Sequence, residues 1–166
     1  MIGVVRIRPE AELRIAVQRG FETHRRQILE VLSDAEVEHV GATAVPGALT
    51  KGDLDVLVRV SASQFDEGVR RLRALYQVHQ PHNWTPTLAS FVEREPTDIP
   101  VGIQLVVAGS SDDAMFRSLR DALKSDPVLL AEYNAFKLGH DGEDYERYTE
   151  IKGTFIEQAR SRLITS

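Results

Sequence analysis

Two aspartates in the first half of the chain have the spacing of a metal-binding pair. Asp53 and Asp55 are separated by one residue at the start of a β-branched segment that we predict to be a strand over residues 54–60. Because side chains alternate along a strand, both carboxylates are expected on the same side. Burying two like charges is costly unless a positive charge neutralises them. Mg²⁺, which prefers oxygen ligands and is commonly held by one or two carboxylates plus substrate phosphates, is the expected partner.

The segment before these aspartates suits a phosphate group. Residues 42–53 contain one proline and two glycines, so we predict a turn or loop without regular structure. Such a loop offers backbone N–H groups, together with the hydroxyl of Thr43 and the ammonium of Lys51. These parts predict metal-assisted phosphoryl or nucleotidyl transfer. The spacing alone also fits an alternative, a solvated turn in which the aspartates accept hydrogen bonds from backbone N–H groups.

Hydrophobic periodicity predicts the elements that position this site. Helical spacing over residues 10–32 is interrupted by Gly20, which predicts one kinked helix or two consecutive helices. Ser63 and Asp66 have the spacing of a capping signal for a helix that ends near residue 76. The other predicted elements are strands over 4–7, 37–41, 88–93 and 101–107, the last two antiparallel, and helices over about 112–124, 127–138 and 144–164.

Composition restricts the class of protein. Strands followed by a helical tail predict an α+β fold, and we expect residues 1–166 to form a single domain because no repeat or linker stands out. The absence of cysteine excludes a thiol nucleophile and a thiolate zinc site. The formal charge of −5 argues against binding long nucleic acid. No apolar run approaches about 18 residues and no signal core is present, so we expect a cytoplasmic protein without membrane association.

Four separated motifs resemble those of the GrpB family. Residues 37–47, Val-Glu-His-Val-Gly-Ala-Thr-Ala-Val-Pro-Gly, followed by Lys51 and Asp55, are similar to the family signature E-H-I-G-S-T-[SA]-V-P-G. The other three are residues 120–127, 132–137 and 148–152, similar to F-R-D-x-L-R-x-x-P, E-Y-x-x-L-K and Y-x-x-x-K. The resemblance implies the nucleotidyltransferase fold, a mixed sheet flanked by helices with a helix-turn metal site. The chain also resembles a domain that is fused to some dephospho-CoA kinases.

The resemblance also implies roles for individual residues. The superfamily pattern of a hydrophobic residue, Gly and a small residue, then a loop and two acidic residues, matches residues 40–42 and 53–55. It implies that Asp53 and Asp55 are catalytic and hold Mg²⁺. The residues implied to bind nucleotide or phosphate are Gly41, Ala42, Thr43, Lys51, Arg120, Lys137, Tyr148 and Lys152. Without the resemblance, we would expect Lys137 and Lys152 to be ordinary charges on a solvated helix face.

Two residues depart from the family pattern. Ala42 stands where the family usually has serine, which removes one hydroxyl that could contact a phosphate. The segment 101–107 offers Gln104 where active enzymes of the superfamily carry a third carboxylate, and Glu93 is our candidate substitute. We expect His39 to orient the loop over 41–47 through a hydrogen bond in preference to acting as a general base.

Two functions fit these residues. One is Mg²⁺-dependent binding of a nucleotide or another phosphorylated small molecule, with nucleotidyl transfer to a hydroxyl acceptor. The other is a non-catalytic ligand-binding or protein-interaction domain that retains the fold. A carboxylate from segment 101–107 near Asp53 and Asp55 would favour turnover, and its absence would favour binding. A nucleotidyltransferase that modifies a protein is a third hypothesis, and it requires a partner protein.

Overall fold

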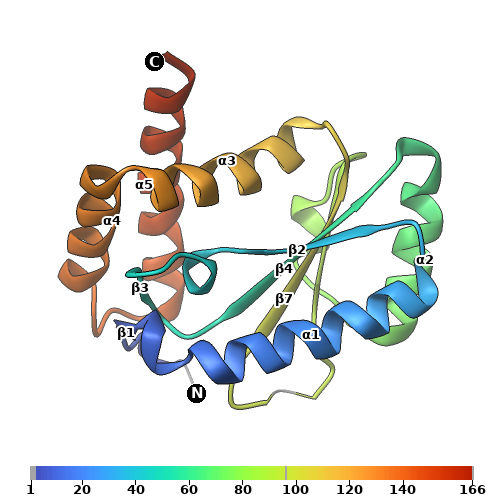
Figure 1. Cartoon of the computed structure of the whole chain (residues 1–166), viewed down its shortest axis with the longest axis horizontal. Coiled ribbons are helices and arrows are strands. Elements are labelled where there is room, and N and C mark those ends of the chain that lie inside the picture. The colour runs from blue at the N-terminus through green and yellow to red at the C-terminus, as the bar shows by residue number, and fades with distance from the viewer. Residues whose placement is uncertain (1–2, 96, 166) are drawn as a thin grey trace.

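The computed structural model describes residues 3–95 and 97–165, and within these residues five strands form a mixed sheet flanked by helices (Figure 1). The strands, in spatial order, are β2 (Glu36–Val40), β4 (Leu54–Val60), β7 (Val101–Val107), β6 (Leu88–Val92) and β5 (Gln77–Val78). β4 and β7 are parallel, whereas the other neighbouring strands are antiparallel. β4 and β7 are interior strands, and the side chains of each point alternately to the two faces of the sheet.

One face of the sheet holds the larger hydrophobic core. Helices α1 (Arg14–Val31) and α2 (Phe65–Leu75) cover this face. Because side chains alternate along β4, the residues that point into this core are Leu54, Val56, Val58 and Val60. Asp55 and Leu57 consequently belong to the opposite face.

Helix α3 (Ser111–Ser125) packs on the opposite face, and α4 (Pro127–Gly139) and α5 (Tyr145–Thr165) lie beside it, near the loop that follows β2 (Figure 1). Phe116 of α3 packs against the buried side chains of Val40, Leu57 and Val106. A further cluster joins the loop after β2 to these helices and consists of Ala42, Val45, Ala48, Leu123, Leu129, Tyr133 and Ala159. The three helices thus enclose the end of β4 where Asp55 lies. No helix in the described ranges has both the length and the apolar character needed to cross a bilayer.

Strong sequence periodicity predicted the main elements correctly. The strands predicted over 54–60 and 101–107 coincide with β4 and β7. The antiparallel pairing of β6 with β7 is also confirmed, with Phe91 opposite Ile103. The three C-terminal helices are present, and Pro127 begins α4 behind the capping side chain of Asp126. These elements are long enough to show a clear pattern.

The N-terminal predictions are partly correct. Of the alternatives of one helix or two over residues 10–32, the structure has one, because α1 continues through Gly20. A Cβ at Gly20 would lie 3.3 Å from the Leu54 side chain, so the glycine allows close packing on the sheet. The strand predicted over 4–7 is displaced along the chain. The paired residues are Arg8–Pro9 (β1), which pair with Leu49–Thr50 (β3), and Val4 forms only an isolated bridge.

Two further predictions differ from the structure, and two short elements were not predicted. The segment 42–53 is partly regular, with a 3-10 turn, η2 (Ala42–Ala44), followed by β3. Ser63 does not cap α2, because it lies inside a 3-10 turn, η3 (Ala62–Gln64), and its Oγ lies 3.1 Å from the Oγ of Ser61. The two-residue strand β5 and the 3-10 turn η4 (Pro81–Asn83) were not predicted.

Candidate functional site

Asp55 lies where three strands meet. In the sheet register it stands between Val40 of β2 and Gly102 of β7. Gly41 follows β2 with a φ of 78°, and a Cβ built on it would lie 3.0 Å from Cγ of Asp55. A Cβ on Gly102 would lie 3.4 Å from Oδ1 of Asp55. The neighbouring glycines thus leave room for this carboxylate against the backbone.

A short hydrogen-bond relay joins β2 to the loop that carries Asp53. Thr43 is buried, and its hydroxyl donates to the carbonyl oxygen of Asp53 at 2.9 Å. The hydroxyl therefore accepts from Nε2 of His39, also at 2.9 Å. Burial, with the nearby charges of Lys124 and Arg120, lowers the pKa of His39 to about 4. His39 is consequently neutral near pH 7 and orients the loop, as the sequence predicted.

Lys51 connects Asp53 to α5. Its Nζ lies 3.2 Å from Oδ2 of Asp53 and 5.9 Å from the ring centroid of Tyr148. Tyr148 is fully buried, and its hydroxyl has no hydrogen-bond partner among the described residues. Burial raises the pKa of Tyr148 to about 12, so the hydroxyl keeps its proton and is available as a donor. A buried hydroxyl without a protein partner is unusual and calls for an explanation.

Two lysines from the C-terminal helices face the same end of the sheet. Lys137 of α4 is only 1% exposed, and its Nζ lies 4.5 Å from the ring centroid of Tyr133. Burial lowers the pKa of Lys137 well below its ordinary value, the charge of Lys152 acts in the same direction, and Asp55 opposes both. Burial also lowers the pKa of Lys152, again opposed by Asp55. The two ammonium groups are therefore poised to gain stabilisation from an added anion.

Asp55 is electrostatically unsatisfied. Burial raises its pKa, Lys152 opposes that shift, and Asp53 adds to it. The charges of Lys51 and Lys137 act in the same direction as that of Lys152, yet burial outweighs all three. This carboxylate is accordingly suited to a cation that the protein itself does not supply.

Glu93 does not supply a third carboxylate, which corrects the sequence-based suggestion. It follows β6 on the side of the sheet that α1 and α2 cover, with Oε2 3.9 Å from Nε2 of His24. Gln104 does lie on the Asp55 side of β7, where its Oε1 accepts a hydrogen bond of 2.6 Å from Ser90. Within the described ranges, no three Asp, Glu, His or Cys side chains gather as a metal-binding set.

The donor set fits one kind of metal site. Asp53 and Asp55 provide carboxylate oxygens, as Mg²⁺ requires, but they are too few to enclose the ion. Mg²⁺ commonly takes its remaining ligands from water and substrate phosphates. The residues present therefore fit Mg²⁺ that arrives together with a phosphorylated ligand, and they do not fit a metal held by the protein alone.

Arg120 and Ala42 have structural contacts in this fold. Nη1 of Arg120 donates to Oε1 of Glu38 at 3.0 Å and to the carbonyl oxygen of His39 at 3.2 Å, which ties α3 to β2. Its Nε also pairs with Asp121. The side chain of Ala42 is packed in the cluster under α3 and α4, so only its backbone can meet a ligand. A phosphate contact for either residue stays a prediction.

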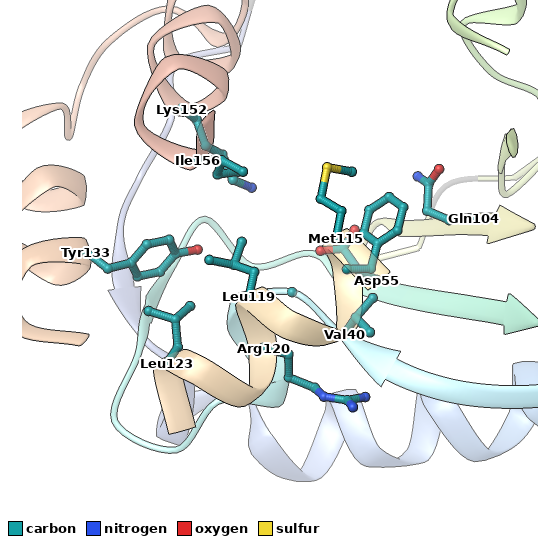
Figure 2. Close-up of a pocket in the computed structure, with 12 residues that line it drawn as sticks. Val40, Asp55, Gln104, Met115, Leu119, Arg120, Leu123, Tyr133, Lys152 and Ile156 are labelled. Atoms are coloured by element: carbon teal, nitrogen blue, oxygen red, sulfur yellow. The ribbon is translucent and has the colours of Figure 1, made fainter. Parts of the chain in front are cut away.

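A cavity of about 160 Å³ adjoins Asp55 (Figure 2). It lies between the strand ends and helices α3, α4 and α5, and Lys152, Gln104, Arg120 and Gly41 also line it. Tyr133 was not predicted as a site residue, although its hydroxyl points into this space (Figure 2). Its spacing of four residues from Lys137 places both on one helix face, which is the sequence signal that could have identified it.

Comparison with known proteins shows the family. The model of the GrpB protein family matches residues 11–162, and the chain belongs to that family. A UPF0157 protein of Vibrio cholerae is 30% identical over 148 residues, which cover 89% of this chain and 77% of that protein. A UPF0157 protein of Deinococcus radiodurans is 26% identical over 150 residues, covering 88% and 77% respectively. The predicted family is confirmed.

Two solved structures show the fold class. The crystal structure of the conserved protein GrpB from Enterococcus faecalis matches with a TM-score of 0.66 and 18% identity, covering 91% of this chain and 96% of that one. The Cid1 poly(U) polymerase with MgGTP bound matches with a TM-score of 0.53 and 16% identity, covering 75% of this chain and 41% of the polymerase. The fold is therefore nucleotidyltransferase-like, a mixed sheet flanked by helices, as predicted.

Proposed function

We propose that this chain binds a nucleoside triphosphate, or another phosphorylated small molecule, together with Mg²⁺. The observation that carries this proposal is the meeting of Asp53 and Asp55 with Lys51, Lys137 and Lys152 at one end of β4. Asp53 and Asp55 would hold the ion. When bound, Mg²⁺ supplies charge neutralisation at phosphate oxygens.

The charges support an anionic ligand that brings its own metal. With all five groups ionised, three lysines and two aspartates sum to +1, and a divalent ion would raise the local charge to +3. A polyphosphate, which carries several negative charges, complements that sum. The depressed pKa of Lys137 adds a second argument, because an anion beside a buried lysine favours its protonated form.

The aromatic residues would complete the ligand contacts. The hydroxyl of Tyr148 is buried and unpartnered among the described residues, so a phosphate oxygen or a polar edge of the base would satisfy it. Lys51, which lies between Asp53 and this ring, would then move from the carboxylate towards the phosphate as Mg²⁺ binds. The fold of the Cid1 poly(U) polymerase, solved with MgGTP, is consistent with this ligand class.

Nucleotidyl transfer is the second candidate function, favoured by the cavity next to Asp55, which can admit an acceptor. The acceptor hydroxyl oxygen would attack the α-phosphorus while its proton passes to the Asp55 carboxylate. The bond from the α-phosphorus to the bridging oxygen would break, and pyrophosphate would leave with the electron pair. Gln104, a neutral side chain on the neighbouring strand, argues for slow turnover or for binding alone.

A thermal-shift screen tests the binding proposal. Wild type, Asp53→Asn and Asp55→Asn would each be melted with ATP, CTP, GTP or UTP, with and without Mg²⁺, and the exposed Asp66→Asn on α2 serves as a matched control. Binding at about 100 times Kd stabilises by about 2.7 kcal/mol, which raises Tm by roughly 5–10 °C at this size. We expect that shift in wild type and Asp66→Asn only, and no Mg²⁺-dependent shift in wild type would refute nucleotide binding.

Pyrophosphate release separates the two candidate functions. A nucleotide that stabilises the wild-type protein would be incubated with Mg²⁺ and candidate hydroxyl acceptors. Acceptor-dependent pyrophosphate that disappears in Asp55→Asn supports transfer. Stabilisation without pyrophosphate supports a ligand-binding domain.

A further inference from the structure

The cavity beside Asp55 is mainly apolar. Figure 2 shows side chains from β2, α3, α4 and α5 arranged around it, with Ile156 and Lys152 entering from α5. The apolar part of its lining consists of Val40, Met115, Phe116, Leu119, Leu123 and Ile156. Small-molecule sites typically combine such an apolar wall with a few convergent polar groups.

Polar groups of opposite charge share this apolar space. The carboxylate of Asp55 and the ammonium of Lys152 both line the cavity. Arg120 also lines it, but its guanidinium is already paired with Glu38 and Asp121, so the charges of Asp55 and Lys152 are left to offset each other. A neutral hydroxyl suits this pair, because it can donate to the carboxylate and accept from the ammonium. A ligand with a net charge would find one partner and one repulsive neighbour.

The cavity is adjacent to the proposed phosphate site without coinciding with it. Asp55 and Lys152 belong to both, whereas Lys51, Lys137 and Tyr148 are outside the cavity lining. Three of the groups suited to a polyphosphate therefore lie outside the apolar wall. This arrangement leaves the cavity for a second ligand, or for a second part of the same ligand.

Volume restricts what the cavity can hold. An apolar protein cavity of about 150 Å³ binds benzene, so a space of about 160 Å³ accommodates one six-membered ring or an aliphatic group of similar size. A nucleoside, with about three times as many heavy atoms as benzene, does not fit inside it. We propose that this cavity binds the apolar body of a small neutral alcohol, with its hydroxyl directed at Asp55 and Lys152.

This inference deepens the proposed function and rests on it only for the reaction that the alcohol would enter, as the acceptor. Binding of the alcohol itself can be measured without nucleotide or Mg²⁺. Benzyl alcohol is a suitable probe because it joins one ring to one hydroxyl. Benzoate and benzylammonium carry the same ring with a negative or a positive charge.

The chain contains its own reporter for this cavity. It has two methionines, Met1 and Met115, and Met115 lines the cavity, so ¹³C-methyl labelling of methionine gives a signal at the site. We expect benzyl alcohol to shift the Met115 methyl resonance saturably with a millimolar Kd. Benzoate and benzylammonium should bind at least about tenfold more weakly, because each places a charge beside a like charge.

Cavity-filling variants check the location. Leu119→Phe is expected to abolish the saturable shift, and Ile156→Phe is a second filling variant in case the first does not fold. Val128→Phe, on an exposed position of α4 that does not line the cavity, is the control. Circular dichroism and Tm verify that each variant is folded.

The outcomes separate this inference from the proposed function. A saturable, filling-sensitive shift with benzyl alcohol supports the inference even if no nucleotide binds. The absence of any shift, insensitivity to both filling variants, or tighter binding of either charged probe would overturn it. Displacement of benzyl alcohol by a nucleotide would also overturn it, because the cavity would then belong to the nucleobase. The result of the thermal-shift screen for nucleotide binding does not depend on whether benzyl alcohol binds.

Discussion

Gly41 and Asp55 are packed against each other so closely that residue 41 has no room for a side chain. A Cβ at this position would lie 3.0 Å from Cγ and 3.1 Å from Cβ of Asp55. The φ of 78° at Gly41 is an additional constraint, because side-chain-bearing residues rarely adopt it. The turn that ends β2 is therefore adapted to the carboxylate on β4.

Gly41→Ala should destabilise the protein more than backbone strain alone would explain. Gly109→Ala is the matched control, since Gly109 has a φ of 83° and a Cβ there would meet nothing within 4 Å. We expect a loss of about 1 kcal/mol in the free energy of unfolding for Gly109→Ala and about 2–4 kcal/mol for Gly41→Ala. Urea denaturation measures both, and equal losses would contradict the close contact with Asp55.

Lys137→Met should improve the stability of the ligand-free protein while weakening nucleotide binding at least about tenfold. The substitution removes a buried ammonium and keeps a long side chain. Burial lowers the pKa of Lys137 in the folded protein below the ordinary value of 10.5. Between these two pKa values the lysine is protonated in the unfolded chain but largely unprotonated in the folded protein, so the stability of the wild-type protein increases with pH. The stability gain should therefore be greatest at low pH and decrease as pH rises towards 10.5.

The exposed Lys124→Met is the control for this variant. Urea denaturation of both variants at several pH values measures the effect. A gain for Lys137→Met that does not change with pH, or one that Lys124→Met shares, would show that the buried charge is not its source.

His39 should make stability fall as the solution is acidified. Its pKa of about 4 lies below the ordinary 6.5, so the folded state binds fewer protons than the unfolded state between these values. Its contribution is fully present above pH 6.5 and is lost as pH falls towards 4, on the order of 2 kcal/mol after allowance for partial exposure. His39→Gln should flatten this dependence, whereas the exposed His82→Gln should not. An NMR titration that placed the pKa of His39 near 6.5 would contradict the account.

Gln104→Glu should strengthen the dependence on Mg²⁺. The new carboxylate would stand on the Asp55 side of β7, and the Ser90 hydroxyl could still donate to it. We expect the Mg²⁺ concentration needed for half-maximal nucleotide binding to decrease severalfold, since a third carboxylate adds a hard oxygen ligand. Gln104→Met, which offers no oxygen, should not lower it. An unchanged Mg²⁺ requirement in Gln104→Glu would place residue 104 outside the metal site.

Sequence patterns predicted the elements that have a clear period. The apolar, β-branched composition of residues 54–60 and 101–107 is typical of buried strands, and it gave the bounds of β4 and β7 correctly. The paired strands β1 and β3 contain two residues each, which is too short for a period to appear. Gly20 left the choice between one helix and two open, and its low helix propensity is outweighed by packing against Leu54.

For the candidate site, the sequence suggested which residues to consider but not which contacts they make. Spacing identified Asp53 and Asp55, and motif resemblance identified the lysines on α4 and α5. The burial of Lys137 and the ion pair of Arg120 with Glu38 depend on how distant helices dock, which no local pattern encodes. The side of the sheet to which Glu93 points likewise depends on where β6 ends, because Glu93 is the residue that follows this strand.

Isothermal titration calorimetry of the wild-type protein with MgATP, MgCTP, MgGTP and MgUTP tests the central claim most directly. Asp55→Asn and the control Asp66→Asn would be titrated in parallel. We expect saturable binding of at least one Mg²⁺-nucleotide to wild type and Asp66→Asn, and at least about tenfold weaker binding to Asp55→Asn. Absence of heat from all four nucleotides, or equal affinity in Asp55→Asn, would contradict Mg²⁺-nucleotide binding at this site.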